Sequence, residues 1–282
     1  MNQHKKKLAA LLMALCIVLS LAACGGSGGG GKSDPLAAAM ANMEKAESMD
    51  AKMMMEMDME AGGQNLETVT TMDCNIFNKP MRMKMDMSMD MGGYGDVSVE
   101  MYAEEAEDGS IVLYQYDGMD WSSQSVTAAD LGQYDVSSSM DSYMASTTGF
   151  KQEGSEEVEG VSAYKYTGVI TGEAMQEVML SSGALDSMST QMNMDEAQMK
   201  DMLSGLGDIA VTMWIDEESL YPVRYDMDMT AIMDGLMGKI LETAGGEEAG
   251  LTMSIPKMTI SMTCSNFNSA TDFTIPEEAK NA

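Results

Sequence analysis

The residues of this chain best suited to chemistry are two cysteines in matching surroundings. Cys74 lies in 72-MDCNIFN-78 and Cys264 in 262-MTCSNFN-268, so both segments read M-x-C-x-x-F-N. Each cysteine alternates with apolar residues, which predicts that both thiols point to the buried side of a strand. Three outcomes stay open for the pair. They are a disulfide between the early strands and the last one, two buried thiols, or a site where thiolates and methionine thioethers bind Cu(I).

A second candidate is the segment 24-CGGSGGGGKSD-34, which from Gly26 matches the phosphate-binding pattern G-x-x-x-x-G-K-S. A phosphate-binding loop needs a strand directly before it. Here the preceding residues are a basic start, an apolar run of about sixteen residues and then small residues, which is typical of a secretory signal. We therefore interpret the glycines as a flexible tether.

The end of that signal has a recognisable sequence. Leu21-Ala22-Ala23-Cys24 resembles the lipobox of bacterial lipoproteins. The resemblance implies that residues 1–23 are removed and that Cys24 carries diacylglycerol through a thioether. Residues 24–34 would then be the tether, and residues 35–282 a single domain. The expected location is the extracytoplasmic face of the cell membrane, with the lipid on Cys24 as the anchor.

Composition excludes several classes of function. The mature chain of 259 residues has a net charge of −32, which repels nucleic acid and anionic headgroups. Its only histidine, His4, is removed with the signal, so imidazole-based catalysis and histidine-bound zinc are excluded. Paired carboxylates remain possible in principle. We expect a non-enzyme with no cofactor and no metal.

Methionine dominates the pattern of the chain. In 81-MRMKMDMSMDM-91 every odd position is Met, which is typical of a half-buried strand with one apolar face. The same alternation recurs in segments that turn residues such as Gly62-Gly63 and Asp108-Gly109 separate, and these segments are 53–59, 97–103, 223–229, 251–255 and 258–262. The first half therefore predicts a meander of long antiparallel strands.

Helices are expected around this meander. Residues 35–48 begin with a proline and carry an apolar face, and residues 230–244 form an amphipathic pattern that ends at two glycines. Shorter helices are expected over 127–145 and 195–206, and a loop over 183–191. The predicted fold is α+β, a large curled antiparallel sheet or open half-barrel with helices packed on its concave face.

This outline resembles the LolA/LppX-type superfamily of envelope lipoproteins and lipid carriers. The matching elements are the helix after the tether, the long meander, the W-I-D-x-x-x-x-x-P-V-R pattern within 211–227 and the closing 273-FTIPEEA-279. In that superfamily the concave face holds acyl chains under the helices. The resemblance therefore implies that this protein binds a lipid or another lipophilic molecule.

Methionine is flexible and polarizable, so a methionine-lined face can repack around ligands of varied shape. The alternative is that these side chains only fill the core. The candidate cavity residues are Met55, Met57, Met83, Met85, Met87, Met89, Met213, Met227, Ile260 and Met262. Two other functions stay open, namely a structural or signalling module with a solid core that contacts an envelope protein, and a Cu(I)-binding protein.

Overall fold

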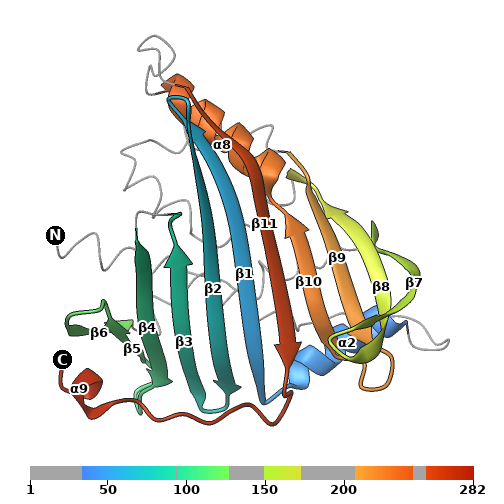
Figure 1. Cartoon of the computed structure of the whole chain (residues 1–282). Coiled ribbons are helices and arrows are strands. Elements are labelled where there is room, and N and C mark those ends of the chain that lie inside the picture. Colours follow the sequence, from blue (N-terminus) through green and yellow to red (C-terminus); the bar gives the residue numbers. More distant parts are fainter. Residues whose placement is uncertain (1–33, 93–94, 127–148, 173–206, 244–251) are drawn as a thin grey trace.

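The computed structural model describes residues 34–92, 95–126, 149–172, 207–243 and 252–282. These residues form one sheet of eleven strands in which every neighbouring pair is antiparallel (Figure 1). The sheet does not close into a barrel, so the α+β open half-barrel expected from the sequence is confirmed.

The strand order is β6-β5-β4-β3-β2-β1-β11-β10-β9-β8-β7. The strands are β1 (Ser48–Ala61), β2 (Gln64–Asn78), β3 (Met81–Asp90), β4 (Asp96–Glu105), β5 (Ile111–Tyr116), β6 (Trp121–Val126), β7 (Lys151–Val158), β8 (Val161–Ile170), β9 (Ile209–Asp216), β10 (Pro222–Asp228) and β11 (Met253–Ser265). The first six strands follow one another across half of the sheet, so the predicted meander is confirmed. Its first turn uses Gly62 and Gly63, whose φ angles of 57° and 79° favour glycine.

The last long strand lies in the middle of the sheet, between β1 and β10. Residues 253–255 of the first alternating run and residues 258–262 of the second are parts of this one strand, although Pro256 separates them. The pairing with β1 shifts register between Asp58 and Glu60, close to the proline. A proline in a central strand is tolerated at such a bulge, because the ladder already lacks a hydrogen bond there.

Two of the expected helices are present. Helix α2 (Pro35–Lys45) follows Asp34, whose carboxylate accepts a hydrogen bond from the backbone N–H of Leu36. Helix α8 (Thr230–Thr243) joins β10 to the segment before β11. The expected elements at 127–145, 183–191 and 195–206 lie outside the described residues. A short helix, α9 (Glu277–Lys280), lies near the C-terminus.

Helices α2 and α8 lie at opposite ends of the strands (Figure 1). Helix α2 lies near β9, and its residues Ala39, Met40 and Met43 belong to the same hydrophobic cluster as the sheet methionines. Helix α8 packs along the first part of β11. No helix within the described ranges is both long enough and apolar enough to span a bilayer.

Candidate ligand-binding face

One face of the sheet, which we call the methionine face, carries Met53, Met55 and Met57 of β1 and their cross-strand partners. Successive strands align these partners in rows. One row consists of Val99, Met87, Met72, Met53, Met262, Tyr225, Met213 and Tyr166. The next row consists of Val97, Met89, Thr70, Met55, Ile260, Met227, Val211 and Gly168.

All ten candidate cavity residues lie on the methionine face, but their burial differs along the strands. Six of them are fully buried: Met83, Met85, Met87, Met213, Ile260 and Met262. The other four are half-buried: Met55, Met57, Met89 and Met227. The face is therefore packed at one end and partly open at the other.

The packed end is the end of the sheet where α2 leads into β1. Met85 has no exposed surface, and Met40 and Met43 of α2 share its hydrophobic cluster. Side chains packed this closely fill a core, and they leave no space for another molecule. Here the core-filling reading of the methionines is correct.

The partly open end lies toward the β1–β2 hairpin, where Met57 pairs with Met258. The first turn of α8 is fixed to this end. The Thr230 hydroxyl accepts a hydrogen bond from the backbone N–H of Met258 at 2.9 Å, and the Asp234 carboxylate accepts one from Ile255 at 2.8 Å. Helix α8 thus starts beside the half-buried methionines.

The methionine face of the six central strands, β1–β3 and β9–β11, carries no charged side chain among the described residues. The charges of these strands lie on the other side, which we call the outer face. Three ion pairs there join Lys52 to Asp73 at 3.1 Å, Lys84 to Asp86 at 2.7 Å and Lys257 to Glu56 at 2.6 Å. The two faces therefore differ sharply in polarity.

Both cysteines lie on the methionine face and are buried thiols. Cys74 and Cys264 are each the cross-strand partner of Ala51, so β1 runs between them. Two strand spacings put their Cα atoms about 9.6 Å apart, beyond the roughly 7 Å that a disulfide can bridge. Of the three open outcomes, this arrangement fits two buried thiols, because β11 pairs with β1 and not with β2.

The same arrangement removes the basis of the Cu(I) hypothesis. The two Met-x-Cys pairs are not on adjacent strands, and burial raises the pKa of Cys264 to about 12, which keeps its thiol protonated. No cluster of three or more histidine, cysteine or acidic residues occurs in the part of the chain that the structure describes.

The matching heptads have a structural role that the sequence does not reveal. Their asparagines, Asn78 and Asn268, both bind the short backbone segment 46–48 between α2 and β1. The Asn78 side-chain amide donates to the carbonyl of Ala46 at 2.7 Å, and the Asn268 side-chain oxygen accepts from the N–H of Glu47 at 2.8 Å. The repeated sequence therefore clamps the start of β1 from both neighbouring strands.

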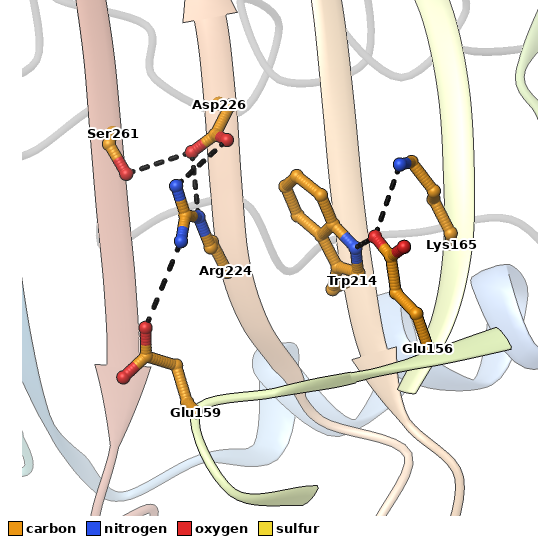
Figure 2. Close-up of polar contacts among 7 residues, drawn as sticks. All are labelled: Glu156, Glu159, Lys165, Trp214, Arg224, Asp226 and Ser261. Carbon is orange, nitrogen blue, oxygen red and sulfur yellow. Dashed lines mark hydrogen bonds and ion pairs between the residues drawn. The ribbon is translucent and has the colours of Figure 1, made fainter. Parts of the chain in front are cut away.

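The W-I-D-x-x-x-x-x-P-V-R pattern is a hairpin with an aromatic–cation contact on the outer face (Figure 2). Trp214 and Arg224 are cross-strand partners, and the Arg224 guanidinium and Lys165 ammonium each lie 5.4 Å from the ring centre of Trp214. Glu156 of β7 accepts a hydrogen bond from the indole N–H at 2.5 Å and pairs with Lys165 at 3.1 Å. These two contacts hold the pKa of Glu156 below its usual range.

The rest of this cluster is also fully paired. Arg224 binds both carboxylate oxygens of Asp226, at 2.9 Å and 3.0 Å, and Asp226 accepts a hydrogen bond from Ser261 at 2.8 Å. A carboxylate of Glu159 lies 4.0 Å from the guanidinium. Because its charges are satisfied internally, the cluster fixes β7 across β8–β10 and presents no open binding group.

One family model covers all of the residues that the structure describes. Residues 34–282 match the family of unknown function DUF6612. The chain belongs to DUF6612. No curated protein matches it.

Solved structures similar to this DUF6612 chain include the lipoprotein LppX and the protein LprF, both from mycobacteria. LppX from Mycobacterium tuberculosis is 15% identical, with a TM-score of 0.43 over 84% of this chain and 95% of that one. LprF from Mycobacterium bovis is also 15% identical, with a TM-score of 0.45 over 87% and 95%. Likeness at this distance carries no argument about function.

The candidate binding residues chosen from the sequence do not include two polar residues of the methionine face, Thr68 and Thr70 of β2. Both are buried. They alternate with outward-facing residues in the run that continues to Met72 and Cys74, so the same period of two that located the methionines also places these threonines. The proposed lipid attachment residue, Cys24, lies outside the described residues.

Proposed function

We propose that this protein is a lipid-anchored extracytoplasmic binding protein that holds a lipid or another lipophilic molecule. The observation that carries the proposal is the uncharged methionine face, which is fully buried at the end near the start of β1 and half-buried around Met55, Met57, Met89 and Met227. Half-buried methionines can adapt to an acyl chain, and burial of apolar surface contributes about 25 cal/mol per Å² without directional bonds. The role is physical binding and not catalysis.

The proposed anchor is Cys24, with residues 24–34 as the tether. The strongly negative mature chain is repelled by anionic headgroups, so the lipid and tether must hold it at the membrane. A flexible tether of about ten residues lets the methionine face move between the bilayer and the space above it. The ligand is then taken from, or returned to, the membrane that the protein is attached to.

Native mass spectrometry of protein purified without detergent tests the proposal. We expect extra mass that corresponds to bound lipid, and displacement of that lipid by a fluorescent acyl ester. Absence of both the extra mass and any probe binding would contradict a lipid-binding role.

The fully buried rows around Met85 favour a second candidate, a structural or signalling module that contacts an envelope protein. In that case the half-buried methionines are covered by the partner. This candidate predicts a monomeric protein that carries no lipid and binds no acyl probe, and that instead cross-links to a specific envelope protein in intact cells.

A further inference from the structure

Thr70 is a buried polar group with no hydrogen-bond partner on an uncharged face. Its side chain is 2% exposed, and its Oγ1 atom makes no hydrogen bond. The neighbouring Thr68 differs, because its hydroxyl donates to the carbonyl of Met57 at 3.3 Å. Buried hydroxyl groups are normally hydrogen-bonded, so an unpaired one calls for a partner that the folded chain does not supply.

The position of Thr70 is the boundary between the packed and the partly open ends. On the side of α2 its face continues into Met72, which is buried. Its own cross-strand partners, Met55 and Met89, are half-buried. A ligand that meets the Thr70 hydroxyl would therefore extend its apolar part toward the β1–β2 hairpin, over Met55 and Met57.

The charge distribution limits the group that binds there. The described methionine-face residues of the six central strands include no lysine or arginine that could neutralise an anion. Burial of an unpaired carboxylate or phosphate on such a face is strongly unfavourable. A neutral carbonyl can instead accept the hydrogen bond of the hydroxyl without a counter-charge.

We propose that the Thr70 hydroxyl is the polar contact of the ligand and that it donates a hydrogen bond to an uncharged carbonyl, such as an ester. The proposal rests on the proposed lipid-binding function and narrows it to neutral acyl esters over ionised fatty acids. Thr70 fixes where the carbonyl lies, and the half-buried methionines accept the chain.

The test compares two fluorescent probes with the same alkyl chain, one with an ester carbonyl and one a plain hydrocarbon. Wild type is expected to prefer the ester. Thr70→Val keeps the shape but removes the hydroxyl, so it should weaken ester binding about fivefold, the worth of one neutral hydrogen bond. Hydrocarbon binding should not change. Thr70→Ser should keep the ester preference. The matched control is Thr71→Val, at an exposed position on the outer face of the same strand, which should bind both probes like wild type.

The possible outcomes separate the two proposals. If wild type and Thr70→Val bind both probes equally, the role of Thr70 is overturned and lipid binding stands. If neither probe binds wild type, the lipid-binding function fails as well. A further readout is the ligand-free stability, since Thr70→Val should unfold at the same or a higher temperature than wild type. A marked loss of stability would show that the hydroxyl has a partner within the protein, and would overturn the inference.

Discussion

Cys74 and Cys264 are both cross-strand partners of Ala51, one on each side of β1. The relationship explains why two such similar segments flank the same strand. Each heptad places its cysteine opposite Ala51 and its asparagine at the segment where α2 passes into β1. The repeat is a structural feature at the centre of the sheet, in which the two cysteines are separate buried thiols.

The register around Ala51 can be tested by a single added thiol. In an antiparallel sheet a residue and its cross-strand partner have Cα atoms about 4.5 to 5.5 Å apart, which a disulfide can bridge. Under oxidising conditions Ala51→Cys should therefore form a disulfide with Cys74 or Cys264, so that one thiol remains titratable after unfolding. Wild-type mature protein should show two. A disulfide between the two natural cysteines in wild type would disprove the register.

Burial of Cys264 predicts a loss of stability in alkali. Its pKa is raised by burial from 9.0 to about 12, so the folded state holds its proton where the unfolded chain has released it. This contribution is complete below pH 9 and disappears as the pH rises from 9 toward 12. The free energy of unfolding should fall by about 1 kcal/mol between pH 8 and 10.

Urea unfolding of wild type and Cys264→Ala at several pH values measures this effect. The variant is less stable at every pH, but its stability should change less between pH 8 and 10. Equal slopes for the two proteins would show that Cys264 does not titrate differently on unfolding.

The asparagine clamp should contribute measurably to stability. Asn78→Ala removes the bond to Ala46 and should cost about 1 to 2 kcal/mol. Asn268 has a φ of 60°, which asparagine tolerates better than alanine, so Asn268→Ala should cost about 1 kcal/mol more. Asn268→Gly should fall between wild type and Asn268→Ala.

Chemical denaturation gives these values. Asn65→Ala is the matched control, because Asn65 is exposed in the β1–β2 hairpin and donates a single long bond to Glu67 at 3.4 Å. Its effect should stay within about 0.5 kcal/mol. If Asn78→Ala and Asn268→Ala lower the free energy of unfolding no more than this control does, the two asparagines do not hold the start of β1.

Gly168 of β8 provides a test of packing at the edge of the methionine face. A Cβ atom there would overlap the ring of Phe150, so Gly168→Ala should destabilise the protein by about 1 to 3 kcal/mol. In a protein that already carries Phe150→Ala, Gly168→Ala should cost much less stability, since the overlapping ring is gone. Strictly additive losses for Gly168→Ala and Phe150→Ala would contradict the contact.

Gly235 of α8 has no atom near the position where a Cβ would lie. Because alanine favours a helix more than glycine does, Gly235→Ala should raise the free energy of unfolding by about 0.5 to 1 kcal/mol.

The sequence predicts the fold well where one physical rule controls it. Alternation with a period of two places the methionines of β1 and β3 on one face, and the caps and apolar stripes locate α2 and α8. Alternation fixes which face a residue occupies, but it does not fix which strand lies beside it. For that reason the sequence places Cys74 and Cys264 on the same face but leaves open whether the two thiols lie close enough for a disulfide.

Two other features depend on long-range pairing and are not visible in the sequence. Asn78 and Asn268 are 190 positions apart, and only the insertion of β11 beside β1 brings both to the segment 46–48. Burial also varies along a strand whose composition is uniform. Met85 and Met57 belong to the same kind of alternating run, but Met85 is fully buried in the main hydrophobic cluster while Met57 is half-buried.

The central claim is that the partly open methionine face binds an acyl chain. The most direct measurement is the affinity of a fluorescent acyl ester for two variants of β1, Met57→Lys and Met54→Lys. Met57 is half-buried on the methionine face, while Met54 is 45% exposed on the outer face. With folding checked by circular dichroism, Met57→Lys should weaken binding by at least about tenfold, because the chain must displace a charge from an apolar site. Met54→Lys should bind like wild type. Equal affinity for both variants and wild type would contradict the claim.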